Sequence, residues 1–88
     1  MPEDHIRQGI CSEVARLLKR ERLRQKISLN ALSARAGLAR QTVTFIENEE
    51  RNPTLDTLLR LTSVLGLTLE ELLQEARSVA SKRSRTKP

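Results

Sequence analysis

The stretch that decides the fold covers residues 28–47 and reads SLNALSARAGLARQTVTFIE. Ser28 has a side chain suited to capping a helix start, and Gly37 has the freedom to end a helix in the left-handed conformation. Between them, apolar or small residues recur at helical spacing: Leu29, Leu32, Ser33 and Ala36. A second amphipathic pattern follows, in which Val43 and Ile46 share one face. The turn between the two patterns is too short for antiparallel helices, so the stretch predicts two helices set at an angle.

Three more helices are predicted around this pair. Ser12 is expected to cap the first of them, over residues 12–26, with Val14, Leu17 and Leu18 at helical spacing. After Asn52-Pro53, Thr54 caps a helix that ends at Gly66, and its predicted core stripe is Leu55, Leu58, Leu59, Thr62 and Leu65. Thr68 and Glu71 form a capping box. It opens a last helix along Leu69, Leu72, Leu73 and Ala76.

Length and composition restrict the class of protein. The chain has 88 residues, of which 38% are hydrophobic and 31% charged, as in a single small globular domain. It has 15 Leu but no Trp or Tyr and one Phe, which favours an aliphatic, helical core. We therefore expect a compact, all-α, five-helix domain over residues 12–76, with a flexible N-terminus over residues 1–11. The Ser-, Lys- and Arg-rich residues 77–88 are expected to form a disordered basic tail.

The distribution of charge points to an anionic partner. The net charge is +5, but residues 12–40 carry +6 and residues 77–88 carry +5, against −1 for residues 1–11 and −5 for residues 41–76. The basic series on the first helix either faces phosphates or forms an ordinary solvated face. No apolar run has the length of a signal peptide or a membrane-spanning helix, and Cys11 has no partner for a disulfide, so we expect a cytoplasmic protein without membrane contact.

The chemistry of an enzyme or a metal site is not apparent in the sequence. His5 is the only histidine, so no Ser-His-Asp arrangement is possible, and His5 with Cys11 supplies too few ligands for zinc. Three glycines at positions 9, 37 and 66 do not form a phosphate-binding loop. We therefore expect no catalytic residue, no metal and no cofactor.

Residues 28–47, followed by Asn52-Pro-Thr-Leu-Asp56, resemble the helix-turn-helix domain of phage repressors and Cro proteins, the XRE type. The resemblance covers about residues 12–76. It implies a lambda-repressor-like domain whose second helix crosses the DNA backbone and whose third helix enters the major groove, usually in a homodimer on a two-fold operator. It also implies a partly buried salt bridge between Arg22 and Glu47. The DNA-backbone contacts that it implies are Ser28, Asn30, Thr42, Asn48 and Arg51.

The third helix offers candidate base contacts on physical grounds. If Val43 and Ile46 are buried, the opposite face presents its side chains to a groove: Arg40, Gln41, Thr44 and Phe45. Arginine pairs two-pronged with guanine and glutamine with adenine, and an aromatic ring can pack on a thymine methyl group. The alternatives are that Arg40 and Gln41 are ordinary solvated residues, that the lone aromatic Phe45 belongs to the core, and that Arg22 and Glu47 are exposed charges.

The sequence departs from the family at two acidic positions. Glu49 and Glu50 stand where a glycine and a basic residue are usual, which places acidic charge near the expected phosphate strand. The favoured function is a sequence-specific, nucleoid-associated transcriptional regulator, a repressor or autoregulator that binds double-stranded DNA as a homodimer. The second is an antitoxin or adaptor whose main partner is another protein, such as a toxin. A third, weaker possibility is nonspecific nucleic-acid binding through the tail.

Overall fold

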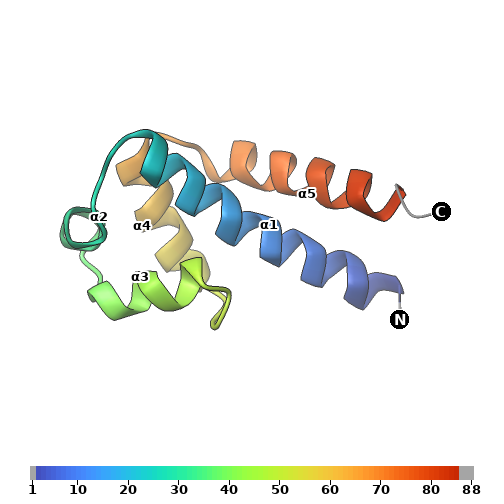
Figure 1. Cartoon of the computed structure of the whole chain (residues 1–88), viewed down its shortest axis with the longest axis horizontal. Helices are drawn as coiled ribbons and strands as arrows, with labels where there is room; N and C mark the ends of the chain where they lie inside the picture. The colour runs from blue at the N-terminus through green and yellow to red at the C-terminus, as the bar shows by residue number, and fades with distance from the viewer. Residues whose placement is uncertain (1, 86–88) are drawn as a thin grey trace.

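Five α-helices make up the part of the chain that the computed structural model describes, residues 2–85. In chain order they are α1 (Pro2–Arg24), α2 (Leu29–Ala36), α3 (Arg40–Glu47), α4 (Leu55–Leu65) and α5 (Leu69–Arg85). Helices α3 and α4 pack against α1, α2 packs against α3 and α4, and α5 returns alongside α1 (Figure 1). Residues 2–85 contain no strand, which confirms the prediction of an all-α, five-helix fold. None of these helices has the length and apolar character needed to span a membrane.

The helix boundaries between residues 28 and 68 follow from local signals. The hydroxyls of Ser28 and Thr54 each accept a hydrogen bond from the backbone N–H three residues on, at 3.0 and 3.1 Å. Thr68 and Glu71 form the reciprocal capping box, with both bonds at 3.1 Å. Two helices end in left-handed glycines with φ of 70° and 74°, Gly37 and Gly66. These local predictions are confirmed.

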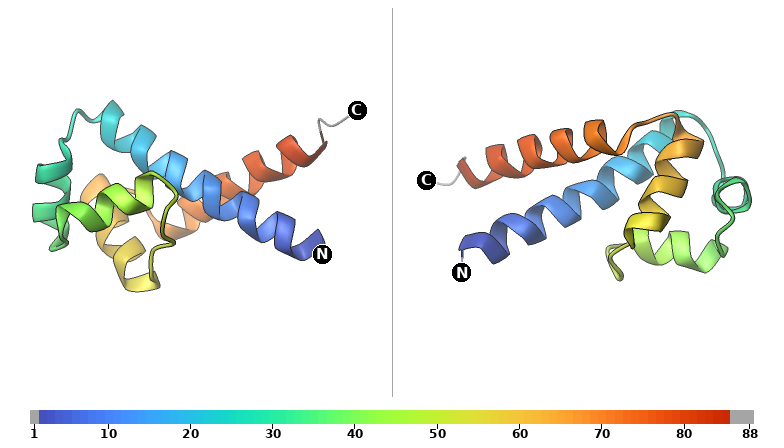
Figure 2. Two further views of the ribbon diagram at one scale, coloured as in Figure 1. Left: turned by 60° about the horizontal axis from the view of Figure 1, so that its bottom comes forward. Right: turned by 180° about the vertical axis from the view of Figure 1, so that it is seen from behind.

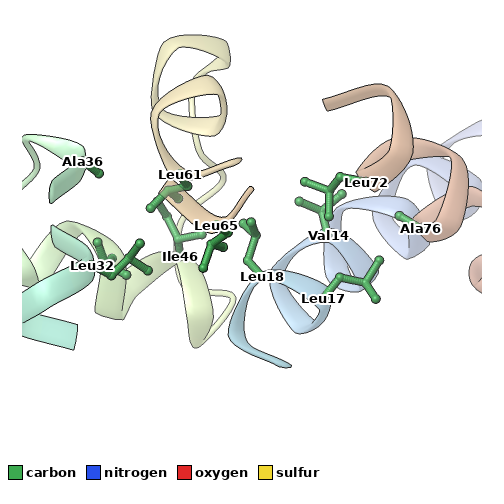
Figure 3. Packing of buried hydrophobic residues seen from close by; sticks show 11 residues of the cluster. Val14, Leu17, Leu18, Leu32, Ala36, Ile46, Leu61, Leu65, Leu72 and Ala76 are labelled. Atoms are coloured by element: carbon green, nitrogen blue, oxygen red, sulfur yellow. The ribbon is translucent and has the colours of Figure 1, made fainter. Parts of the chain in front are cut away.

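The core is aliphatic and extends over all five helices. Its buried members include Val14, Leu17, Leu18, Leu32, Ala36, Val43, Ile46, Leu61, Leu65, Leu72 and Ala76. Figure 3 shows Leu32, Ile46 and Leu61 on one side, Val14, Leu72 and Ala76 on the other, and Leu18 between the two groups. The helix-turn-helix segment and the α1–α5 pair therefore share one continuous core.

The predicted core stripe of α4 is wrong at two positions. Leu55 and Leu59 are 63% and 49% exposed, whereas Leu61 is 1% exposed and lies in the core with Thr62 and Leu65. Leucines occur on nearly every side of this helix, so two stripes, rotated from each other, both satisfy helical spacing. The face of α4 that contains Leu61 is buried because it contacts α1 and α2. Helical spacing in the sequence fits both faces and therefore does not identify the buried one.

The first and last helices both extend beyond their predicted bounds. Helix α1 begins at Pro2 rather than at Ser12, and α5 continues to Arg85 rather than ending before the expected tail. The structure thus has helix over residues 2–11 and 77–85, where a flexible N-terminus and a disordered tail are expected from the sequence, and residues 1 and 86–88 lie outside the described part. The physical reason is mutual support, since α1 and α5 make the most extensive contact between any two helices.

We call residues 4–13 of α1 and 76–83 of α5 the stem. Its two helices carry both described ends of the chain away from α2 and α3 (Figures 1 and 2). A Cβ placed on Gly9 would lie 3.5 Å from the Cβ of Ala80, so the helices approach closely there. One turn further on, Glu13 is 4% exposed and its Oε2 lies 3.2 Å from Nη1 of Arg83. Small side chains and an ion pair thus join the segments.

Candidate nucleic-acid interface

A three-residue turn sets α3 at an angle to α2. The left-handed Gly37 begins the turn, and the backbone N–H of Leu38 donates to the carbonyl of Ser33 at 2.8 Å. Arg60 of α4 adds a bond from Nη1 to the carbonyl of Ala36 at 3.2 Å, which satisfies an acceptor at the end of α2. Helix α3 then begins after Ala39, whose side chain makes no capping hydrogen bond. The orientation of α3 therefore rests on the turn and on packing rather than on an N-cap.

The face of α3 opposite the core carries the four predicted base contacts. Val43 and Ile46 are 1% and 2% exposed, so they fix which side of the helix is buried. Arg40 and Gln41 are exposed at the N-terminal end of the helix. Thr44 is half-buried, and its hydroxyl donates to the carbonyl of Arg40 at 3.2 Å.

Phe45 lies at the edge between this face and the segment after α3. Its ring is half-buried, and the guanidinium carbon of Arg51 lies 4.6 Å from the ring centroid. An arginine over an aromatic face is attracted by the ring quadrupole. The contact holds the charge of Arg51 next to α3.

The predicted backbone contacts lie at the ends of the two helices. Ser28 and Asn30 are exposed at the start of α2, although the hydroxyl oxygen of Ser28 already accepts the capping bond. Asn48 and Arg51 are exposed just past the end of α3, and Thr42 is half-buried in its first turn.

Arg22 and Glu47 join α1 to the end of α3 through a two-pronged ion pair. Nε of Arg22 donates to Oε2 of Glu47 at 2.7 Å and Nη2 donates to Oε1 at 3.0 Å. Their side chains are only 9% and 5% exposed, and Nη1 of Arg22 also donates to the carbonyl of Ile27 at 2.9 Å. Because the fork geometry of a guanidinium admits few orientations, the pair fixes α3 relative to α1.

The acidic residue Glu49 is held by α1. It has a φ of 62°, a left-handed conformation that is costly for a residue with a Cβ, and its Oε2 lies 3.6 Å from Nε of Arg16. Arg16 also donates to Oε2 of Glu13 at 2.6 Å, and Arg83 reaches the same oxygen. An ion-pair chain therefore links the stem to the end of α3. Sequence analysis missed it, although the spacing of Glu13 and Arg16 on one helix was an available signal.

Much of the basic series on α1 is neutralised within the molecule. Arg20 pairs with Glu75 of α5 at 3.0 Å, and Arg24 pairs with Glu21. Hydrogen bonds from Arg24 and then Gln25 lower the pKa of Glu21 from 4.5 to about 2, against the opposing effect of burial. For these arginines, the structure favours the interpretation of the series as a self-compensated surface rather than a phosphate-binding one.

Comparisons with known proteins agree with this arrangement. The family model described as "Helix-turn-helix" matches residues 18–72. The chain is 30% identical over 71 residues to a protein of Methanosarcina barkeri named "Putative HTH-type transcriptional regulatory protein Mbar_A2318". It is 31% identical over 71 residues to similarly named proteins of Methanosarcina mazei and Methanosarcina acetivorans.

The extent of these matches differs between the two partners. Each covers 81% of this chain but 22% of the relative, so the chain spans about a fifth of the length of the curated relatives it matches. No solved structure matches the chain. The family model nevertheless covers more than half of the chain and includes α2, the turn, α3 and the Arg22–Glu47 pair. The chain therefore belongs to the helix-turn-helix family.

Proposed function

We propose that the protein is a sequence-specific DNA-binding transcriptional regulator that inserts α3 into the major groove. The observation that carries this proposal is the state of Arg40 and Gln41. Both are exposed at the N-terminal end of α3, away from the buried Val43 and Ile46, and among the described residues the side chain of neither has a hydrogen-bond or ion-pair partner, although the backbone carbonyl of Arg40 accepts from Thr44. Their donors and acceptors are therefore available to base edges, and the N-terminal residues of a recognition helix make such contacts.

One of the two acidic residues after α3, Glu49, is partly compensated by α1. The pairing of Glu49 with Arg16 directs its charge toward α1, which reduces the repulsion of a phosphate strand. Arg51 and Asn48, exposed at the same end of α3, offer a cation and an amide for backbone contacts. Ser28, Asn30 and Thr42 would add contacts at the other end of the two helices.

Selection of bound fragments from random duplex DNA, followed by affinity measurements, tests the proposal. Substitution of Arg40 or Gln41 by Ala should cost roughly 1 to 3 kcal/mol on the selected site and relax preference at one or two base positions. Random DNA should be bound almost as before. Lys82→Gln on α5 is the control, because loss of a general attraction should weaken all sequences alike. Equal losses on selected and random DNA from the α3 variants would favour the protein-binding adaptor or antitoxin function instead.

We also propose that the regulator represses by occupancy as a homodimer, in the cytoplasm and on the nucleoid. The support is apolar surface, since Leu59 of α4 and Leu73 of α5 are 49% and 41% exposed. A two-fold dimer on DNA would place its two α3 helices about 34 Å apart, one helical turn. A sedimentation series checks this, with Leu59→Ser expected to weaken dimers and Leu23→Ser, at an exposed leucine of α1, as the control. Monomers alone, with and without DNA, would contradict the dimer.

A further inference from the structure

A cleft with a mixed apolar and polar lining lies between the N-terminal part of α1 and the segment that follows α3. Its volume is about 280 Å³, and its floor includes the apolar side chains of Ala15 and Ile46. The polar side chains that line it come from both segments: Arg7, Gln8 and Ser12 from α1, and Arg51 and Asn52 from the segment after α3. Two guanidinium groups, two amides and a hydroxyl therefore share this cleft with one carboxylate, that of Glu49.

The charges around this cleft favour an anion. Among the described residues, Arg7 forms an ion pair with a neighbour in its own helix, with Nη2 at 3.3 Å from Oδ1 of Asp4, and both side chains are more than half exposed. Such an exposed pair contributes little stability, so an incoming anion can replace Asp4. Glu49 also lines the cleft, and its ion pair with Arg16, in which the two atoms lie 3.6 Å apart, offsets part of its repulsion of an anion.

The cleft continues the candidate nucleic-acid interface. Arg51 lines it and also lies over the ring of Phe45 on α3, so one side chain belongs to both surfaces. In Figure 1, the loop after α3 lies between α3 and the N-terminal half of α1. Arg7 comes from the stem, which begins outside the residues matched by the helix-turn-helix model.

We propose that this cleft binds one phosphodiester group of the duplex that α3 reads, with Arg7 and Arg51 as its cationic ligands. The proposal rests on the proposed DNA-binding function. A guanidinium donates two parallel hydrogen bonds to a phosphate, and the amides of Gln8 and Asn52 supply further donors. The stem thus lengthens the backbone contact beyond the helix-turn-helix segment, and this contact carries no base preference.

The test compares Arg7→Gln with Arg77→Gln, which removes the same charge from an exposed position on α5. Affinity for a selected duplex is measured across a series of salt concentrations. Arg7→Gln should reduce the slope of log K against log salt by about 0.9, as expected for one lost phosphate contact, while Arg77→Gln keeps the wild-type slope. Equal slopes in the two variants would overturn the proposal, because the effect of Arg7 would then be general attraction only.

A second variant and a free anion complete the experiment. Asp4→Asn removes the competing carboxylate and should raise affinity for selected and random duplexes by the same factor, whereas unchanged or lower affinity would count against the cleft.

Inorganic phosphate should shift the backbone amide resonances of Arg51 and Asn52 only weakly, and not at all in Arg7→Gln. Saturable phosphate binding with an unchanged salt slope in Arg7→Gln would overturn the proposal in favour of a free-anion site. If the wild-type protein binds no duplex, both proposals fail; if it binds and Arg7→Gln matches it, only the cleft proposal fails.

Discussion

Four residues of the described chain hold the backbone in the left-handed region, and two of them are not glycines. Gly37 and Gly66 end α2 and α4, whereas Lys26 and Glu49 follow the ends of α1 and α3 with φ of 58° and 62°. A Cβ costs roughly 1 to 2 kcal/mol in this conformation. The chain therefore accepts backbone strain at both ends of the helix-turn-helix segment and avoids it at the turn itself.

The two glycines form a matched pair for mutation. A Cβ on Gly37 would lie 2.9 Å from Nη1 of Arg60, whereas nothing lies within 4 Å of a Cβ on Gly66. Gly66→Ala should therefore cost about 1 kcal/mol through backbone strain alone. Gly37→Ala should cost about 1 kcal/mol more, because Arg60 must give up its bond to Ala36. Urea unfolding measures both costs, and they should become equal when Arg60 is replaced by Ala.

Glu21 should give stability a dependence on pH. Because its folded pKa of about 2 lies below the value of 4.5 in the unfolded chain, its contribution is present above pH 4.5 and is lost as pH falls toward 2. Glu21→Gln should flatten the dependence of the unfolding free energy on pH in that window. The side chain of Arg24 is 68% exposed, so added salt should have a similar effect. Parallel acid curves for wild type and variant at low salt would contradict this.

At the scale of elements, the position of α3 depends on contacts from helices outside the helix-turn-helix pair. Arg22 of α1 holds the end of α3 through Glu47, and Arg60 of α4 holds the end of α2. Each arginine is distant in sequence from the residue to which it donates. The angle at which α3 would meet DNA is therefore set by α1 and α4 as well as by the turn.

The Arg22–Glu47 pair should be strongly coupled. Arg22→Ala leaves a carboxylate that is nearly buried without its partner, so it should cost about 3 kcal/mol, and the added Glu47→Ala should recover part of this loss. A double-mutant cycle of unfolding free energies measures the coupling. The exposed pair of Arg20 and Glu75 is the control, with an expected coupling below about 1 kcal/mol. Similar coupling in both pairs would show that burial adds nothing.

The elements that sequence analysis located correctly are those with local signals. Ser28, Thr54 and Thr68 cap helices through bonds to residues three positions away, so a short stretch of sequence contains the whole interaction. The pairing of Arg22 with Glu47 could be anticipated only from the family resemblance, because 25 residues separate the two. The α4 stripe was misassigned because its leucines satisfy two patterns, and tertiary contacts decide between them.

At the scale of the whole molecule, the stem makes the protein longer than its helix-turn-helix segment requires. The molecule extends over 42 × 21 × 20 Å, and the long dimension includes the paired ends of α1 and α5. The start of α1 was missed although Pro2, Glu3 and Asp4 are typical of a helix N-terminus. No local sequence feature indicates that α5 continues past residue 76. This part of α5 packs against Gly9 and Glu13, which lie far away in the sequence.

Gly9→Ala should stabilise the stem. Glycine inside a helix costs about 0.5 to 1 kcal/mol relative to alanine, and the added Cβ would make an ordinary van der Waals contact with Ala80. Unfolding free energy should rise by up to that amount, and amide exchange in residues 4–13 should slow. Gly9→Leu is the opposite control, because a larger side chain would force the two helices apart. No change in exchange for Gly9→Ala would mean that the stem opens independently of this contact.

The packing of α1 against α5 has a consequence for how the chain is made. Of the described helices, α1 is translated first and α5 last. The partners on α5 of three α1 residues are therefore translated about sixty residues after them: Val14, Leu17 and Glu13. Until then the apolar side of the nascent α1 remains exposed, and such surface is where aggregation of partly made chains begins. The buried side of α1 that faces α5 is therefore covered later than the helix-turn-helix segment is made, because α5 follows that segment in the chain.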